Sequence, residues 1–508
     1  MAITAGGSLN SVASPMQATL HTNYLDLAGT ADEGWAQQYL PDLMEKEAEV
    51  FGPRTISGFL SQVGAEESMT ADQVVWSEQG RLHLAYKGNI SAHSGGTSAS
   101  GEITIEDDID GNVGAGAFVA NDHGIRVNDI IIVSSSAGTA KCIVRKVEAS
   151  GGVIDVAPYG LANLSSIDNT TSKATTILVI GSEYGKGKSY TNATTEATAA
   201  DSRGANEPFF KSFNNKPVII KDYYEVSGSD TARIGWVETT SEEGQTGYLW
   251  YLKAESDTRA RFNDYLEMMM LEAELGVSGT DDVDDFLGAG NLPAAVTGQS
   301  TGTQGLFAAI TARGNITTGV TGVNAATDLA EFDAILAEFD SQGAIEENMM
   351  FVNRATSLAM DDMLASMNSY GAGGTSYGVF NNSEDMALNL GFSGFRRGSY
   401  DFYKSDMRYL NDKATRGGIN SADPTNAIRG VIIPAGTSSV YDQQLGKNLK
   451  RPFLHVRYRA SKTDNRRLKT WITGSVGATT SALDAMQIHM LSERCLITQG
   501  ANNFMLMQ

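Results

Sequence analysis

The sequence predicts an α+β protein in which strands and helices follow one another without regular alternation. Between residues 102 and 160, short β-branched runs are separated by Gly, Ser, Asn and Asp, which is typical of a small all-β module. Residues 255–276 carry the clearest helical pattern, and strand-like runs dominate from residue 385 onward. Because strands and helices do not alternate one by one, this order favours a mixed architecture over a parallel α/β sheet.

The first segment, residues 1–40, is rich in Gly, Ser, Ala and Thr and has little periodicity, so we expect an extended arm. A short helix is predicted around "PDLMEKEAEVF" within 41–63, where Pro41 suits a helix start. Residues 71–86 contain two strand-like pieces around Gln79 and Gly80. Glycine supplies the positive φ that tight hairpins favour, so a hairpin is predicted there.

The all-β module is predicted from the four runs "EITIED", "RVNDIIIVSS", "AKCIVRKVEA" and "GVIDVAPYG". In "KCIVRKV" the residues Cys142, Val144 and Lys146 alternate with Ile143, Arg145 and Val147, so one face is not cleanly apolar. We interpret the module as a compact insertion of about 70 residues, a size at which independent stability is marginal.

The longest predicted helix covers "ESDTRARFNDYLEMMMLEAELG". Ser256 or Asp257 suits its N-cap, and Gly276 can end it in the left-handed conformation. The run of three methionines at 268–270 is interpreted as adaptable packing. The apolar stripe repeats at three and four residues and consists of Phe262, Tyr265, Met269 and Ala273.

A second helix is predicted over 327–343, with Asp328 and Glu331 as a capping pair. Its apolar side would consist of Leu329, Phe332, Leu336 and Phe339. "ENMMFVN" follows as a strand and "ATSLAMDDMLASM" as a third helix.

The composition suits a large globular product, since 41% of the 508 residues are hydrophobic. The two cysteines, Cys142 and Cys495, rule out a disulfide framework and fit a reducing compartment. The first basic residue is Lys46, so no secretory signal is predicted. No run approaches the ~18 apolar residues of a membrane span. We therefore expect a soluble intracellular product.

Charge is unevenly distributed along the chain, whose net charge is −22. Residues 1–393 hold 21 basic and 52 acidic side chains, whereas residues 394–508 hold 17 basic and 8 acidic ones. The basic part interleaves Arg and Lys with aromatic residues, as in "KNLKRPFLHVRYRASKTDNRRLKTW". Docking against an acidic neighbouring copy is the interpretation we favour. Nucleic-acid binding and an ordinary solvated face stay open as alternatives.

The stretch "TTILVIGSEYGKGKSY" resembles a nucleotide-binding phosphate loop but has the wrong spacing. Such a loop needs two glycines separated by four residues and followed by Lys and Ser or Thr. Counting back from Lys188 and Ser189, the first glycine should occupy the position of Ser182, but it lies at Gly181. The following "TNATTEATAADSRG" lacks a helical apolar period. We interpret 181–189 as a flexible surface loop.

Two acidic stretches and one serine motif also lack the context that their chemistry requires. "EDDIDGN" places Glu106, Asp108 and Asp110 like the start of a calcium loop, but the twelfth position is Ala117 rather than Glu. "TDDVDDF" at 280–286 holds four carboxylates in no ligand pattern. "GQSTG" around Ser300 has neither the strand before it nor the helix after it that a nucleophile elbow needs.

The histidines, at 21, 83, 93, 123, 455 and 489, show no metal-ligand spacing. The sequence therefore yields no catalytic, cofactor-binding or metal-binding residue, and we predict that the chain is not an enzyme and carries no cofactor.

The order of elements resembles that of the major capsid proteins of tailed bacteriophages, the Hong-Kong-97 fold. An arm leads to a hairpin region interrupted by a β insertion, then to the strand in "KPVIIKDYYEVSGS", a long helix, a mixed domain and long terminal strands such as "MQIHMLSERCLITQGANNFML". The local matches are "WSEQGRLH" and "YYEVSGS". The chain looks like the larger members that carry an insertion domain, such as those of crAss-like phages.

The resemblance implies a division of the chain into five parts. These are an N-terminal arm at 1–65, an extension loop at 66–94 and 171–240, an all-β insertion domain at 95–170, a peripheral domain at 241–310 and 441–508 with a spine helix at 256–276, and an axial domain at 311–440.

It also implies pentamers and hexamers of an icosahedral virion shell around double-stranded DNA, assembled in the bacterial cytoplasm. Separate scaffolding, portal and decoration proteins would be the partners, and no membrane is involved. The alternatives are a tail or portal-associated ring protein, or a nucleotide-binding enzyme that uses the 181–189 loop.

Overall fold

The computed structural model describes residues 65–92, 101–109, 123–147, 152–167, 171–187, 210–229, 239–240, 246–247, 249–276, 302–343, 345–369, 394–435, 437–442, 447–476 and 479–508. The chain divides into two compact units, which are the barrel unit, 77–212, and the main unit, 1–76 with 213–508. Nearly all of the arm predicted over 1–65, including the helix predicted within 41–63, lies outside the described residues.

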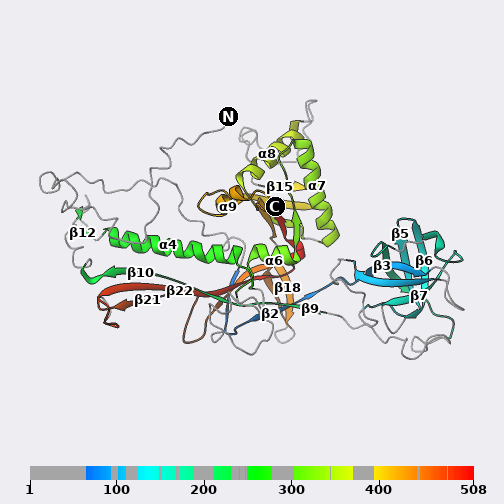
Figure 1. Cartoon of the computed structure of the whole chain (residues 1–508), viewed down its shortest axis with the longest axis horizontal. Helices are drawn as coiled ribbons and strands as arrows, with labels where there is room; N and C mark the ends of the chain where they lie inside the picture. Colours follow the sequence, from blue (N-terminus) through cyan, green and yellow to red (C-terminus); the bar gives the residue numbers. More distant parts are fainter. Residues whose placement is uncertain are drawn as a thin grey trace. The chain divides into compact units, whose positions relative to one another are not determined.

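The barrel unit contains six antiparallel strands that close on themselves in the order β3-β4-β7-β6-β5-β8 (Figure 1). Because every strand has two neighbours, closure pairs the main chain on both sides and leaves no sheet edge. The strands are β3 (Ala85–Ala92), β4 (Glu102–Asp108), β5 (Asp129–Ser135), β6 (Gly138–Val147), β7 (Val153–Pro158) and β8 (Thr175–Ser182). The barrel begins before and ends after the insertion domain predicted over 95–170, because β3 and β8 supply the strands that close it.

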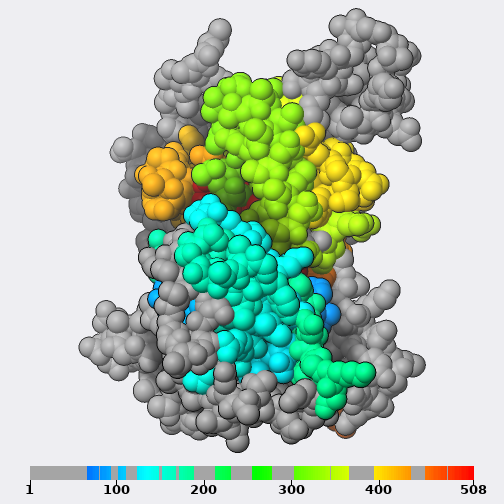
Figure 2. Space-filling view, turned by 90° about the vertical axis from the view of Figure 1, so that its right-hand side faces the viewer, coloured from blue at the N-terminus to red at the C-terminus, as the bar shows by residue number. Residues whose placement is uncertain are grey.

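The barrel interior is filled by apolar side chains from alternate strand positions, and the four runs read from the sequence form β4 to β7. The register between β6 and β7 shifts between Val144 and Lys146. This bulge returns Val147 to the interior after Val144, which explains why the alternation in "KCIVRKV" is irregular. Figure 2 shows the side of the barrel that faces the viewer, in cyan and blue-green, as a closely packed surface.

Asp129 lies at the start of β5 with its side chain buried, and its carboxylate accepts a hydrogen bond of 2.8 Å from the backbone N–H of Arg126. Burial raises the pKa of Asp129 above its usual value, and the contacts with Arg126 only partly oppose this. The folded barrel therefore binds this proton more tightly than the unfolded chain does, so ionisation of Asp129 weakens the barrel as pH rises through its folded pKa.

We expect the Asp129→Asn variant to gain stability relative to the wild type at pH 7, because the amide keeps an acceptor for Arg126 without a buried charge. The gain should shrink as pH falls through the folded pKa of Asp129. Denaturant unfolding of both proteins between pH 4 and pH 8 measures the difference. A constant difference across this range would contradict the assignment.

Two cysteine side chains are completely buried, Cys142 in the barrel and Cys495 in the main unit. Burial raises the pKa of each thiol to about 12. At pH 8 the reactive thiolate should therefore be about a thousandfold scarcer than in a thiol of ordinary pKa. We expect neither cysteine to react with a maleimide in the native protein within an hour, and both to react after unfolding, as measured by intact mass.

The first sheet of the main unit is organised around β22, the longest strand. β10 pairs with one side of β22 over ten consecutive residues in unbroken register. β20 and β21 both pair with the other side of β22. β1 pairs with β20 in the parallel direction. The strands are β1 (Ala65–Met69), β10 (Val218–Ser227), β20 (Leu454–Arg459), β21 (Lys469–Gly474) and β22 (Ala485–Thr498).

Helix α4 (Leu249–Glu272) lies along β10 and β22 (Figure 1), and Phe262 and Leu266 pack against Ile220 and Met490 of these strands. The helix predicted over 256–276 is thus present, but it begins earlier and ends before Gly276. The predicted N-cap is wrong, since Ser256 and Asp257 lie inside the helix. The preceding "LWYLKAE" contains no helix breaker, so the helix extends through it.

The buried side of α4 also differs from the predicted stripe. Phe262 is buried, but Tyr265 and Met269 are 42% and 36% exposed, and Leu266 and Met270 are buried instead. The two stripes differ by one residue at the same spacing of four. The choice between them depends on which side meets the sheet, which helix periodicity alone does not determine.

The second sheet of the main unit has six strands in the order β13-β23-β17-β14-β16-β15. Its strands are β13 (Asn315–Thr317), β14 (Glu347–Val352), β15 (Gly394–Arg397), β16 (Tyr400–Asp406), β17 (Gly430–Pro434) and β23 (Met505–Met507). Successive side chains of β14 point to opposite faces of this sheet and pack in two different hydrophobic clusters. Met350 and Val352 belong to one cluster, and Phe351 belongs to the other. Both faces of the central strands are therefore buried.

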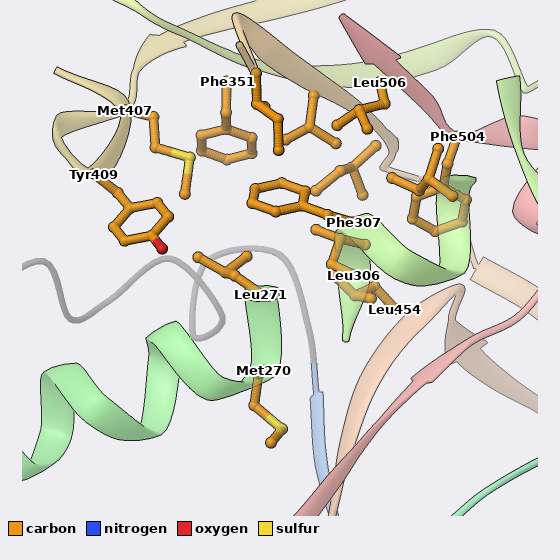
Figure 3. Packing of buried hydrophobic residues seen from close by; sticks show 14 of the residues in the cluster. Met270, Leu271, Leu306, Phe307, Phe351, Met407, Tyr409, Leu454, Phe504 and Leu506 are labelled. Atoms are coloured by element: carbon orange, nitrogen blue, oxygen red, sulfur yellow. The ribbon is translucent and has the colours of Figure 1, made fainter. Parts of the chain in front are cut away.

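One core lies between this sheet and two helices, α7 (Ala325–Gln342) and α8 (Arg354–Ser369). The other contains α6 (Leu306–Arg313), the 3-10 turn η4 (Arg408–Leu410) and the end of α4, and the short helix α9 (Arg416–Ala422) lies next to η4. Figure 3 shows this second core, where Leu271 of α4 and Phe307 of α6 point toward Phe351. The core thus joins the end of the long helix to the six-stranded sheet.

The predicted helix at 327–343 is confirmed as α7, but its cap differs from the prediction. The side chain of Asn324 accepts the N-cap hydrogen bond. Asp328 and Glu331 instead accept hydrogen bonds of 2.8 Å from the backbone N–H groups of Gly322 and Thr321. The predicted pair therefore holds the turn before the helix. The strand in "ENMMFVN" and the third helix are confirmed as β14 and α8.

The hairpin predicted at 71–86 is wrong, because its two strands pair with other partners. β2 (Val74–Gln79) pairs with β9 (Phe210–Asn215), while β3 pairs with β4 and β8 in the barrel. The rings of Trp76 and Phe213 lie 6.2 Å apart, and the guanidinium of Arg313 lies over both. These contacts stabilise the observed pairing more than the local turn would stabilise a hairpin.

Two further strand pairs are β11 (Thr239–Thr240) with β12 (Thr246–Gly247), and β18 (Thr437–Asp442) with β19 (Lys447–Pro452).

Candidate functional site

The basic, aromatic part of the C-terminal sequence forms β19, β20, β21 and the loop between β20 and β21. Arginines of β20 and this loop pair with acidic residues from the start of the described chain. Arg457 pairs with Glu67 of β1 at 2.7 Å. Arg467 pairs with Glu66 of β1, and Arg459 with Asp72. Since Arg459 and Asp72 are 387 positions apart, no local sequence pattern could have revealed these pairs.

Glu493 of β22 is the centre of this network. Its carboxylate is 6% exposed and receives the guanidinium groups of Arg459 and Arg466, each at 2.6 Å. Arg494, the next residue, is also buried and donates to the backbone carbonyl of Arg467 at 2.9 Å. Burial lowers the pKa of Arg494. Arg466 donates a charge-assisted hydrogen bond to the buried carboxylate and Arg459 forms an ion pair with it, so two guanidinium groups hold Glu493 in place.

The network changes the interpretation of the charge asymmetry. The sequence left docking on a neighbour, nucleic-acid binding and a solvated face open, and the structure adds pairing within the chain. An acidic partner in the same chain is present for each of four arginines, Arg457, Arg459, Arg466 and Arg467. Acidic side chains of the same chain therefore neutralise much of the described basic cluster. Only basic side chains without such an acidic partner can attract an acidic group of another molecule.

A second polar cluster joins α4 to the six-stranded sheet. At the end of α4, the carboxylate of Glu272 accepts a hydrogen bond of 2.8 Å from the Tyr409 hydroxyl and pairs with Arg416 of α9 at 2.8 Å. Burial, followed by the charge of Glu272, raises the pKa of Tyr409. The cluster fixes the end of the long helix to η4 and α9.

The glycine-lysine loop does not form a phosphate loop in its described part. Gly181 lies within β8 and pairs with Ile130 of β5, so its backbone belongs to a sheet ladder. A phosphate loop would need this glycine at the start of a turn whose N–H groups converge on an anion. Lys188 and Ser189 lie outside the described residues.

The acidic motif at 106–112 is partly described, and its carboxylates hold the barrel together. Glu106 accepts hydrogen bonds from the Ser172 hydroxyl, at 2.9 Å, and from the backbone N–H of Lys173. Asp107 is buried and pairs with the Lys173 ammonium at 2.7 Å. Asp110, Ala117, Ser300 and the stretch 280–286 lie outside the described residues. Within the described ranges, no group of three or more His, Cys, Asp and Glu could hold a metal ion.

The described histidines lie in different environments. His123 is buried in the barrel unit and His455 in the main unit, whereas His83 is exposed. His489 of β22 stacks between two aromatic rings. His21 and His93 lie outside the described residues. Among the helices that the structure describes, none is long and apolar enough to cross a bilayer.

Solved structures of phages are similar to this chain at low sequence identity. A Microbacterium phage Oxtober96 chain is 10% identical, with 94% of this chain and 99% of that chain covered and a TM-score of 0.36. A chain of the bacteriophage PhiM1 mature capsid is 9% identical, with coverages of 62% and 78% and a TM-score of 0.29. A chain of the cyanophage P-SCSP1u capsid is 9% identical, with coverages of 62% and 79% and a TM-score of 0.29. No family model and no curated protein matches the chain.

Proposed function

We propose that this chain is the major capsid protein of a tailed bacteriophage and that it assembles into the pentamers and hexamers of an icosahedral shell around double-stranded DNA. Its place is then the virion capsid, assembled in the cytoplasm of the bacterial host, with separate scaffolding, portal and decoration proteins as partners. The proposed role is structural rather than enzymatic.

The observation that carries the proposal is the placement of α4. This helix lies along the β10–β22 pair, and its end enters the core of the six-stranded sheet through Met270 and Leu271. Glu272 adds the polar connection to Tyr409 and Arg416. One long helix thus joins two sheets, and we propose that it is the spine helix that the resemblance implies.

The proposed division of the main unit follows from these two sheets. The peripheral domain is α4 with β10, β20, β21 and β22, and the axial domain is the six-stranded sheet with α7 and α8. The terminal strand β23 pairs with β13 and β17, so the last residues of the chain belong to the axial part. The closed barrel lies between β2 and β9 in the sequence, where the resemblance places an insertion domain.

Assembly of the purified chain tests the proposal. We expect closed shells or capsomers of five and six copies in negative-stain electron microscopy, together with a large sedimenting species. Co-expression with a scaffolding protein from the same genome should increase the yield. A monomer at every concentration and salt condition would contradict the proposal. Flat rings of six or twelve copies without shells would favour a tail or portal-associated protein instead.

A further inference from the structure

The five-stranded sheet has one face that α4 does not cover, here called the open face. Along β10, Ile220 packs toward the helix, while its neighbours Ile219 and Tyr223 point away from it and are 51% and 56% exposed. Trp471 of β21 lies on the same face and is 36% exposed. Large apolar side chains that lie together on an exposed surface are typical of an interaction site.

Three aromatic rings form a row across the open face. Tyr223, His489 and Trp471 are directly opposite one another on β10, β22 and β21. The ring centroids of Tyr223 and His489 lie 5.9 Å apart, and those of Trp471 and His489 lie 5.2 Å apart, both in stacked geometry. The Thr473 hydroxyl lies 2.7 Å from His489 Nε2. The row is therefore a preorganised surface whose outer rings stay available for contact.

Beside this row, the open face has a shallow basic hollow. It is lined by Lys221, Arg466, Lys469, Trp471 and Leu491. Arg466 is paired with Glu493 and Lys469 with Asp464. No acidic group among the described residues pairs with Lys221, so its ammonium group is available to an acidic group of a binding partner.

The edge of β10 adds main-chain groups to the same surface. Among the strands that the structure describes, β10 is the last in the order of the five-stranded sheet and pairs with β22. The segment "VIIKDYYEVS" contains no proline and no bulge. A long strand edge of regular register is suited to adding a strand from another chain.

We propose that the open face, together with the outer edge of β10, is the docking site for a second copy of this chain, with Tyr223 and Trp471 as aromatic anchors and Lys221 facing an acidic group of that copy. The inference rests on the proposed assembly of the chain. Charge identifies the occupant: residues 1–393 carry an excess of 31 acidic side chains, so a second copy supplies carboxylates opposite Lys221. Tyrosine and tryptophan are among the residues enriched in interface hot spots.

Thiol labelling tests this directly, because both native cysteines are completely buried. An Ile219→Cys variant has one exposed thiol on the open face, at a position that is not one of the proposed anchors. Maleimide labelling is followed by intact mass on the unassembled protein and on purified assembled particles. Val323→Cys, at a position 71% exposed before α7, controls for general slowing of the reagent by the particle.

We expect fast labelling of the Ile219→Cys variant in the unassembled protein and labelling at least tenfold slower in the particle, while the Val323→Cys control stays fast in both. Equal rates in both states would overturn the docking site while leaving assembly intact. Slow labelling in the unassembled protein would also overturn it, because the chain would cover its own face. Protection of unassembled protein by double-stranded DNA would assign the face to nucleic acid instead. If no particle forms under any condition, the proposed function fails first, and this inference fails with it.

Discussion

Replacing Phe332 by alanine should destabilise the main unit by about 3–5 kcal/mol, because the substitution removes a fully buried ring and leaves a cavity. Phe332 is 0% exposed on α7. Its ring centroid lies 5.5 Å from that of Phe395 and 5.2 Å from that of Phe402. Losing these pairs adds to the loss of buried area. Denaturant unfolding followed by far-ultraviolet circular dichroism measures the effect on the main-unit transition.

The matched control is Leu358→Ala on α8, where the side chain is 54% exposed. An exposed leucine has little burial to lose, so we expect a change within about 0.5 kcal/mol. A loss below about 1 kcal/mol for the Phe332 variant would show that the aromatic cluster is not the centre of this core.

The second large effect should come from Asp361→Ala, which leaves a buried ammonium without its carboxylate. Lys404 of β16 pairs with Asp361 of α8, and their side chains are 6% and 10% exposed. In the variant, the Ser357 carbonyl, at 3.2 Å, remains as an acceptor for the Lys404 ammonium. Breaking a buried ion pair from one side costs about 3–5 kcal/mol. Unfolding of the variant in urea at pH 7 measures this loss.

A double substitution separates the penalty of the unpaired charge from the value of the pair. With Asp361→Leu and Lys404→Met together, no buried charge is left, and similar apolar volume fills the site. We expect the double variant to recover most of the stability that the single variant loses. If the double variant is as unstable as the single one, specific packing around Asp361 rather than charge burial determines the effect.

Local sequence patterns predicted those elements whose signal is complete within one segment. The four β-branched runs between residues 102 and 158 became β4 to β7, and the period of three and four in 327–343 became α7. The partners of the elements could not be predicted in the same way. β2 and β3 lie on either side of a good turn signal, yet they do not pair with each other, because β2 pairs with β9 and β3 pairs with β4 and β8.

The buried side of α4 and the charge network show the same limit. Leu266 rather than Tyr265 meets the sheet, and only the placement of β10 and β22 determines this. Glu66 and Glu493 form ion pairs with arginines of the basic C-terminal part. From the sequence alone, these arginines are interpreted as available for a neighbouring copy. The open face was also missed, since Tyr223, His489 and Trp471 belong to three separate strands. Exposed aromatic residues within alternating strands were the one signal that could have indicated it.

Cryo-electron microscopy of assembled particles tests the central claim most directly. The account predicts a closed icosahedral shell in which the six-stranded sheet surrounds the fivefold and sixfold axes and α4 extends outward from it. A dispersed monomer in all conditions, or an assembly in which neighbouring copies do not form closed five- and six-membered rings, would contradict it.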